Sequence, residues 1–336
     1  MDKRVMFAVA GSGKTTYIVN QLTQTKRSLI VTYTTANCDN LRRKITEKFN
    51  GVWPSNVTLL SYFSFLYSFC YKPFLSDRYK TRGIIYKPNP SRFEKQTDLS
   101  YFMTENRYLY SNRISLFMEK QDILGDIEDR ICKYFDEFIV DEVQDIAGRD
   151  FTFLESLMEI ALNMLFVGDF YQHTFDTSQD GKANSTLFKN KKTYESRFIK
   201  KGFLVDNTTL ENSWRCSQNI CQYIRDNLDI EIASNRKEHD NTSIEFIDNR
   251  QKIDAILMDD KIIKLHYQNG AKAGGCHKNW GETKGEDCYQ DVCVMLNKKT
   301  ASKRVAGRLV ELPQPTKNKL YVAITRAKGN VYLVNE

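Results

Sequence analysis

The sequence predicts an α/β fold with parallel sheets, and three observations indicate this class. Short apolar runs typical of buried strands alternate with helical patterns along most of the chain. A loop of small residues at 10–13 joins the first apolar run to the first helical one. The length of 336 residues is sufficient for two domains of ordinary size, so we expect two α/β units.

The first unit is expected to span residues 1–202. Its predicted strands are apolar runs at residues 5–9, 28–33, 57–60, 138–140 and 164–167. Its predicted helices lie at residues 15–19, 37–49 and 151–161. Residues 65–130 break this alternation and mix tyrosines with basic side chains, so we expect a compact insertion there, with a helix over residues 116–131.

The second unit is expected to span residues 203–336. Residues 174–201 before it are polar, basic and predicted to be loop-rich, and they are the expected position of a hinge. The predicted strands lie at residues 203–205, 244–246, 262–265, 291–296 and 331–334, with a helix at 218–227. Residues 270–285 are rich in glycine and are expected to form a loop.

Composition sets limits on the protein class. The net charge of +7 is a moderate basic excess, which is compatible with a polyanionic partner. No apolar stretch of about 18 residues is present, so neither a membrane span nor a membrane partner is expected. The eight cysteines follow no CxxC spacing, which favours buried free thiols in a reducing, cytoplasmic setting over structural zinc.

The segment AVAGSGKTT, at residues 8–16, has the character of a phosphate-binding loop. Gly11 and Gly13 allow a tight turn whose N–H groups point inward, and the following helix adds its positive end. Lys14 can reach the β- and γ-phosphates, and the Thr15 hydroxyl can bind Mg²⁺. The general pattern begins with a glycine where this chain has Ala8. The predicted nucleotide contacts are Ala10, Gly11, Ser12, Gly13, Lys14, Thr15 and Thr16.

Acidic and amide groups follow two later strands. Asp141 can hold Mg²⁺, and Glu142 can activate an attacking water as general base. An isolated Asp-Glu pair is also typical of an exposed turn, but the full string DEVQD is much less common. Gln172, after the strand at 164–167, can sense the γ-phosphate. Arg215 and Arg326, in the second unit, are candidate arginine fingers.

The order of these motifs resembles that of superfamily 1 helicases of the UvrD/Rep/PcrA type. AVAGSGKTT looks like their motif I, VDEVQD like motif II, and YVAITRAK like motif VI. The remaining matches are residues 32–37 with the following helix (motif Ia), 57–63 (the next DNA-contacting motif), 167–175 (III), 210–216 (IV) and 283–287 (V). The matches keep the family's order over nearly the whole chain.

The resemblance implies two RecA-like P-loop NTPase lobes that use ATP and Mg²⁺. The implied phosphate, metal and catalytic residues are Lys14, Thr15, Asp141, Glu142, Gln172, Arg215 and Arg326. Trp214 stands where the family stacks an aromatic on adenine, and Glu286 where it contacts the ribose. The implied contacts with single-stranded or tailed duplex DNA are Tyr33, Thr34, Phe63 and Phe175. Movement in the 3′ to 5′ direction is the family tendency.

Departures from the family pattern are also present. The glutamine segment that reads adenine ahead of motif I has no match here, which leaves the preference for ATP over other NTPs open. Motif III lacks its tryptophan, and Gly281 stands where motif V normally has a histidine. The short gap between Arg215 and Lys284 leaves no room for a large inserted subdomain in the second lobe. The sequence therefore predicts a minimal motor.

Three functions are compatible with these residues. The first is an ATP-dependent DNA helicase that translocates on single strands and unwinds duplexes. The second is an ATP-switched DNA-binding subunit of a larger complex, for example with a nuclease in recombination or anti-phage defence. The third is a catalytically dead relative, which the presence of Lys14, Asp141, Glu142, Arg215 and Arg326 argues against.

Overall fold

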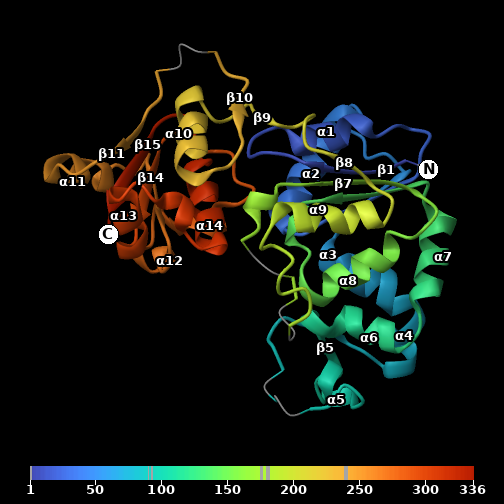
Figure 1. Ribbon diagram of the computed structural model, residues 1–336. Helices are drawn as coiled ribbons and strands as arrows, with labels where there is room; N and C mark the ends of the chain where they lie inside the picture. The colour runs from blue at the N-terminus through green and yellow to red at the C-terminus, as the bar shows by residue number, and fades with distance from the viewer. Residues whose placement is uncertain (1, 90, 92–93, 175–176, 179–181, 238–240) are drawn as a thin grey trace. The chain divides into compact units, whose positions relative to one another are not determined.

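The computed structural model describes residues 2–89, 91, 94–174, 177–178, 182–237 and 241–336, which form two compact units (Figure 1). The first unit comprises Met1–Met6, Thr15–Gly168 and Asp176–Asp206. The second comprises Phe7–Lys14, Asp169–Phe175 and Asn207–Glu336. The loop after the first strand therefore packs with the carboxyl-terminal part of the chain. The division of the chain into domains at residues 1–202 and 203–336 stays a prediction.

The first unit is built on a six-stranded sheet in the order β3-β2-β6-β7-β1-β8. Its strands are β1 (Lys3–Phe7), β2 (Ser28–Thr32), β3 (Val57–Ser61), β6 (Glu137–Asp141), β7 (Asn163–Gly168) and β8 (Leu204–Asp206). β2 and β6 are buried along their whole length, as expected for central strands of a parallel sheet. The helices α1 (Lys14–Gln21), α2 (Thr35–Lys48) and α8 (Gly148–Leu157) connect these strands.

Two expectations for residues 174–206 need correction. Residues 191–200 were expected to be loop-rich but form α9 (Lys191–Lys200), because Asn190 caps the helix and Tyr194 and Phe198 are buried. The strand predicted at 203–205 is present as β8, but it pairs in parallel with β1 and so belongs to the first sheet.

The insertion forms a small subdomain with its own aromatic core. Its elements are a π-helix (Phe65–Tyr71), α4 (Lys72–Tyr79), β4 (Gly83–Ile85), α5 (Leu99–Phe102), β5 (Tyr108–Tyr110), α6 (Ile114–Lys120) and α7 (Leu124–Tyr134). The rings of Tyr71, Tyr79 and Phe102 pack around Phe117. The single helix predicted at 116–131 is wrong: Asp122 has a left-handed backbone (φ 56°), which separates α6 from α7.

The second unit is built on a parallel sheet in the order β11-β15-β14-β12-β13. Its strands are β11 (Ile244–Phe246), β12 (Ile263–His266), β13 (His277–Asn279), β14 (Val292–Leu296) and β15 (Val331–Asn335). The helices α10 (Gln218–Leu228), α11 (Arg250–Met258), α13 (Lys298–Val305) and α14 (Gln314–Ile324) accompany it, with the short pair β9 (Asn212–Ser213) and β10 (Ala233–Ser234). The described part of this unit contains no large inserted subdomain.

The expectation that residues 270–285 form a loop was wrong for part of that segment. β13 adds an edge strand beside β12, and α12 (Gly270–Ala273) precedes it. The buried Trp280 anchors the segment, since its Nε1 donates a hydrogen bond to the Leu265 carbonyl at 2.9 Å. Burial of one large ring thus offsets the conformational cost of the glycines.

Five of the eight cysteines are buried free thiols, while Cys132 and Cys288 are exposed and Cys276 is half-buried. Among the residues with described positions, no three His, Cys, Asp or Glu side chains cluster as metal ligands. None of the helices in the described ranges combines the length and apolar character that crossing a membrane requires.

Candidate nucleotide and nucleic-acid sites

Three predicted motifs follow strands of the first sheet at one edge. β6 and β7 are parallel neighbours, and β1 lies on the other side of β7. Asp141 ends β6, Gly168 ends β7, and the glycine loop follows β1. In parallel α/β sheets, ligands bind outside the carboxyl ends of strands, so this edge is the candidate nucleotide site.

The glycine loop has the backbone and the donors that phosphate binding requires. Gly11 and Gly13 adopt left-handed conformations (φ 71° and 91°) that favour glycine. α1 begins at Lys14, so its first N–H groups have no acceptor within the helix. Among the described residues, no group pairs with the buried hydroxyl of Ser12. Buried polar groups are normally paired, so these donors fit an anionic ligand such as a polyphosphate.

Within the second unit, residues 210–215 are hydrogen-bonded to the glycine loop. The Val9 N–H donates to the Leu210 carbonyl at 3.0 Å, and the Trp214 N–H donates to the Gly11 carbonyl at 2.9 Å. The Trp214 side chain is 67% exposed, and a Cβ at Gly13 would lie 4.0 Å from its Cδ1. An exposed indole therefore lies beside the loop, as a base-stacking residue requires.

Both predicted arginine fingers contact protein groups in this structure. The Arg215 guanidinium donates to the Thr325 carbonyl at 2.9 Å and pairs with the Asp287 carboxylate. Arg326 is 1% exposed and holds the Thr283 carbonyl at 3.2 Å. In this arrangement the two guanidinium groups join motifs of the second unit to one another.

Glu286, the predicted ribose contact, is also engaged. Its carboxylate accepts hydrogen bonds from Lys278 Nζ at 2.7 Å and from the Tyr289 hydroxyl. Burial, together with the Glu286 carboxylate, raises the pKa of Tyr289 to about 12, so the phenol remains a donor. A ribose contact would require Glu286 to exchange one of these partners.

The acidic motif is held by Gln144, a neighbour that was not among the residues predicted from the sequence. Asp141 is buried, and its Oδ1 accepts the Glu142 N–H at 3.0 Å. Glu142 has a left-handed backbone (φ 57°), and its carboxylate accepts a hydrogen bond from the fully buried Gln144 amide. A Cβ at Gly168 would overlap Gln144 Oε1, so this glycine leaves space for the amide. The signal for Gln144 was its place in DEVQD.

Gln172 lies in a short 3₁₀ turn, Phe170–Gln172, and is buried. Asp169 starts this turn by accepting the Tyr171 N–H on its Oδ1 at 3.0 Å. The turn that carries the predicted phosphate sensor is therefore fixed by the Asp169 carboxylate, which immediately precedes the turn and belongs to the same, second unit.

Three aromatic rings of the first unit form a row. Tyr33 and Phe63, both predicted nucleic-acid contacts, have centroids 6.2 Å apart. Tyr86, from the insertion, packs edge-on against Phe63 at 5.1 Å and is 66% exposed. Thr34 caps α2, its hydroxyl accepting the Asn37 N–H at 3.1 Å. Phe175, the fourth predicted contact, lies outside the described residues.

Comparisons with known proteins support this architecture. No protein-family model matches the sequence, and no curated protein matches it. Among solved structures, an arterivirus nonstructural protein 10 (helicase) in complex with DNA is similar, with a TM-score of 0.52 and 13% identity over 99% of this chain. A crystal structure of the arterivirus protein alone gives a TM-score of 0.51 and 14% identity over 98% of this chain. The chain shares the fold of these helicases.

The match extends over 60% and 59% of those two proteins, so this chain spans less than two thirds of their length. At such low identity the likeness concerns the fold. It confirms the predicted class, an α/β chain whose parallel sheets have the RecA-like helicase arrangement within each unit.

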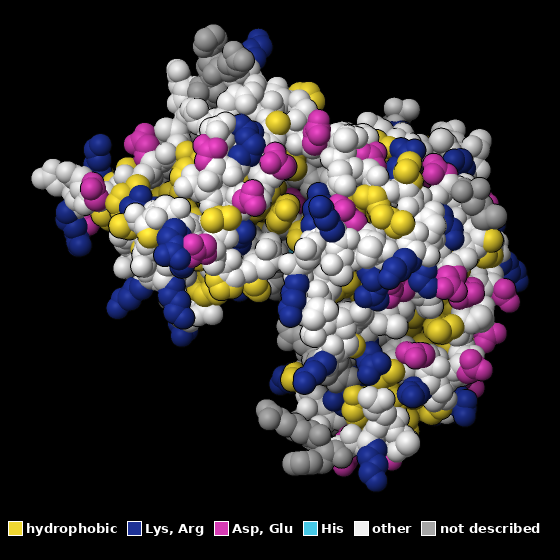
Figure 2. All heavy atoms as spheres, viewed as in Figure 1, with side chains coloured by type: hydrophobic (Ala, Val, Ile, Leu, Met, Phe, Trp, Pro, Cys, Tyr) yellow, Lys and Arg dark blue, Asp and Glu magenta, His cyan; other side chains and the backbone are white. Residues whose placement is uncertain are grey.

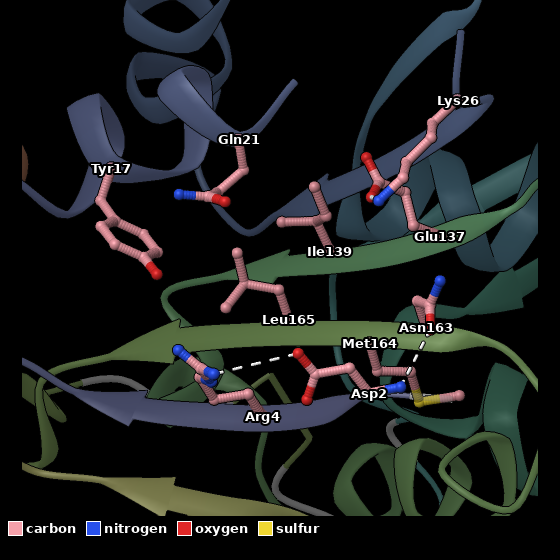
Figure 3. A pocket seen from close by; sticks show the side chains of 10 residues that line it. All are labelled: Asp2, Arg4, Tyr17, Gln21, Lys26, Glu137, Ile139, Asn163, Met164 and Leu165. Atoms are coloured by element: carbon pink, nitrogen blue, oxygen red, sulfur yellow. Dashed lines mark hydrogen bonds and ion pairs between the residues drawn. The ribbon is translucent and has the colours of Figure 1, made fainter. Parts of the chain in front are cut away.

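A separate pocket of about 250 Å³ lies at the opposite edge of the first sheet (Figure 3). It is lined at the amino ends of β1, β6 and β7, and its charged groups face one another. Arg4 lies 3.9 Å from Asp2, and Lys26 lies 3.9 Å from Glu137. No glycine loop or helix start lines it, so it lacks the anion-binding character of the carboxyl edge.

Basic side chains are spread over the visible surface, with acidic ones among them (Figure 2). In the insertion, exposed lysines and arginines accompany the aromatic row in the sequence: Lys72, Arg78, Lys80, Arg82 and Lys87. Lys80 pairs with Asp77 at 2.6 Å. This mixture of cations and rings is typical of surfaces that track a nucleic-acid backbone.

Proposed function

We propose that this protein is an NTP-driven helicase or translocase of the UvrD type, acting on single-stranded or tailed duplex DNA. The observation that carries the proposal lies within the second unit, where the Trp214 N–H is hydrogen-bonded to the Gly11 carbonyl and Arg215 packs closely against Gly11. A loop with unsatisfied donors, an exposed aromatic and a nearby arginine are the parts that a nucleotide-dependent motor needs. The fold shared with helicases supports the same proposal.

The phosphate side of the site is assigned to the loop and to β6. The amides of Gly11 and of residues 13–16, with the Lys14 ammonium, would bind phosphate oxygens of ATP. The predicted contacts through the Ala10 and Ser12 N–H groups need correction, because these groups donate to the Tyr321 hydroxyl and the Val9 carbonyl in this structure. The Thr15 hydroxyl and Asp141 would hold Mg²⁺, which when bound neutralises phosphate charge. Glu142, held by Gln144, would accept the proton of the attacking water, and Gln172 would contact the γ-phosphate.

The base and sugar side is assigned to the second unit. Trp214 would stack on the base, and Glu286 would contact the ribose. Arg215 would exchange Asp287 for phosphate oxygens, and Arg326 would act as the second finger after releasing a carbonyl. Such an exchange of partners would couple the nucleotide to movement of motifs in this unit.

The nucleic-acid surface is assigned to Tyr33, Thr34 and Phe63, with Phe175 as a further predicted contact. Tyr86 extends the row, since it touches Phe63 and exposes its ring. Base stacking on such rings contributes about 1–3 kcal/mol per base. Movement in the 3′ to 5′ direction is part of the proposal.

The decisive experiment measures NTP hydrolysis and strand displacement by the purified chain. Substrates carry a 3′ tail, a 5′ tail or blunt ends, as DNA and as RNA, and each NTP is supplied with Mg²⁺ in turn. We expect hydrolysis to rise with single-stranded DNA and to vanish in Lys14→Ala and Glu142→Gln. Lys261→Ala, which removes an exposed lysine of the second unit, is the matched control.

The outcomes separate the alternatives. Displacement of the 3′-tailed DNA substrate supports the helicase, whereas displacement only from a 5′ tail contradicts the proposed direction. Hydrolysis stimulated by DNA without displacement favours the switched subunit, and capture of a nuclease partner would support it further. Absence of hydrolysis with every nucleic acid and every NTP would refute an active motor.

A further inference from the structure

One buried hydroxyl of α14 joins the glycine loop to the turn that carries Gln172. The Ala10 N–H donates to the Tyr321 hydroxyl at 2.9 Å, and the same hydroxyl donates to Asp169 Oδ2 at 3.1 Å. All three residues belong to the second unit, and the Tyr321 side chain is fully buried. The phenol therefore uses its acceptor and its donor on two different loops.

Asp169 transmits this contact to the sensor turn. Its Oδ1 accepts the Tyr171 N–H at 3.0 Å, and its backbone carbonyl accepts the Gln172 N–H at 2.9 Å. The Tyr171 ring packs edge-on against Tyr321, with centroids 6.1 Å apart. A shift of the Tyr321 hydroxyl would therefore change the position of the whole turn at Phe170–Gln172.

A second contact from the same helix fixes the end of this turn. Asn318, one helical turn before Tyr321, donates from Nδ2 to the His173 carbonyl at 2.9 Å. Asn318 is 1% exposed, so this hydrogen bond is shielded from water. Residues three apart on a helix share one face, and this face of α14 therefore holds the turn at two places.

We propose that Tyr321 is a positioning residue that fixes the glycine loop and the Gln172 turn in position relative to each other. This inference rests on the proposed function, because it assigns the two loops to the nucleotide. The hydroxyl acts through Ala10 and Asp169. A nucleotide-driven shift of either loop must then break or move its hydrogen bond to the Tyr321 hydroxyl. Because the other loop is bonded to the same hydroxyl, phosphate contact at the glycine loop is coupled to the position of Gln172.

The chemistry of the hydroxyl suits this role. Burial and the Asp169 carboxylate raise the pKa of Tyr321 well above its usual range, so the phenol keeps its proton and remains a donor. Removal of the oxygen leaves a buried amide and a carboxylate oxygen each short of one partner, and unmet buried polar groups are costly. Phenylalanine keeps the ring and its packing, so the hydroxyl can be tested separately.

The test compares Tyr321→Phe with wild type, and uses Tyr332→Phe as the matched control. Tyr332 lies on β15 of the same unit, and its hydroxyl lies 3.5 Å from Asp291, away from the glycine loop. The first readout is hydrogen exchange of the Ala10 amide, which does not depend on activity. We expect it to quicken by about tenfold or more in Tyr321→Phe and to stay unchanged in Tyr332→Phe.

The second readout is steady-state NTP hydrolysis with single-stranded DNA. We expect kcat to fall by about tenfold or more and KM for nucleotide to change by less than about threefold, because Lys14 and the loop amides remain. Asp169→Asn is the second variant, in case Tyr321→Phe folds poorly, and it should show the same split. The Tyr321→Phe/Asp169→Asn double variant should lose no more kcat than the less active of the two single variants, because both substitutions break the same chain of hydrogen bonds.

The possible results are distinct. Wild-type Ala10 exchange together with wild-type kcat in Tyr321→Phe overturns the inference. A rise in KM with kcat unchanged also overturns it, since that result indicates a binding role alone. If wild type hydrolyses no NTP, the proposed function fails and the coupling fails with it, while faster Ala10 exchange would still establish the hydrogen bond.

Discussion

A methyl group at Gly11 tests whether residues 213–215 pack on the glycine loop. The Cβ of Gly11→Ala would lie 2.6 Å from the Arg215 Cβ and 2.8 Å from Ser213 Oγ. Carbon atoms pack best about 3.5–4.0 Å apart, so the chain at residue 215 would have to move. Because the Arg215 N is also only 3.3 Å away, rotation of one flexible side chain cannot relieve the overlap.

The expected cost has two parts. Gly11 has φ 71°, a conformation that costs an L-residue about 1–2 kcal/mol. Overpacking against a backbone adds about 1–3 kcal/mol. Gly11→Ala should therefore lower the free energy of unfolding of the second unit by about 2–5 kcal/mol, the sum of the two terms.

Two matched glycines separate these terms. Gly13 also has a positive φ (91°), but the nearest atom to its Cβ would be Trp214 Cδ1 at 4.0 Å. Gly307 has φ 65°, and no atom lies within 4 Å of its Cβ. Alanine at either position should cost only the conformational term, about 1–2 kcal/mol.

The assay is urea unfolding followed by tryptophan fluorescence, to which the buried Trp280 in the core of the second unit contributes. Nucleotide binding is measured in parallel, and Gly11→Ala should lose it while Gly307→Ala keeps it. The reasoning is refuted if Gly11→Ala is no less stable than Gly13→Ala and Gly307→Ala. That result would mean that residues 213–215 are not packed against Gly11.

Three further expectations concern the first unit. Tyr86→Ala should weaken binding of single-stranded DNA by about 1–3 kcal/mol in fluorescence anisotropy, whereas Tyr134→Ala, on α7, should not; equal affinities would contradict the aromatic row. Gly168→Ala should displace Gln144 and lower kcat by about tenfold or more with nucleotide affinity retained; normal kcat would exclude a role for that amide. Burial raises the pKa of Asp150 to about 6, against 3.8. The contribution of protonated Asp150 to the free energy of unfolding is therefore fully present below about pH 4. It is lost as the pH rises through about 6, by up to about 3 kcal/mol. Asp150→Asn should flatten this part of the stability curve, and an unchanged curve would show that another group titrates.

The strands of the two large sheets, except β13, were predictable from the sequence because most of them are short and apolar with polar flanks. Their partners were not, as residues 203–205 illustrate. The pattern predicted a strand there, but its pairing with β1 depends on where the chain returns after α9. That return is a tertiary event, and β8 is half-exposed like many edge strands. The local pattern of residues in β8 therefore contains no information about which sheet the strand joins.

The segment at 270–285 failed for a different reason. Glycines at 270, 274, 275, 281 and 285 indicate a loop by local preference. A tertiary contact decided otherwise, since Trp280 is buried in the core of the second unit and donates to Leu265 of β12, the strand beside which β13 pairs. A single large aromatic residue within a glycine-rich stretch was the available signal, because such a ring is costly to leave in water.

The residues of the candidate site likewise differ in whether a local sequence pattern or a tertiary contact reveals them. Lys14, Asp141 and Glu142 could be proposed from sequence because their chemistry is carried by short contiguous strings. Tyr321 could not, because its role follows from hydrogen bonds to Ala10 and Asp169, which are separated from it in the sequence by 311 and 152 positions. Yet Tyr321 lies in the almost wholly apolar run Leu320–Ile324 of a buried helix, where a phenol must find a partner. A lone hydroxyl in such a run is therefore evidence for a contact between distant motifs, and here that contact joins the two loops assigned to the nucleotide.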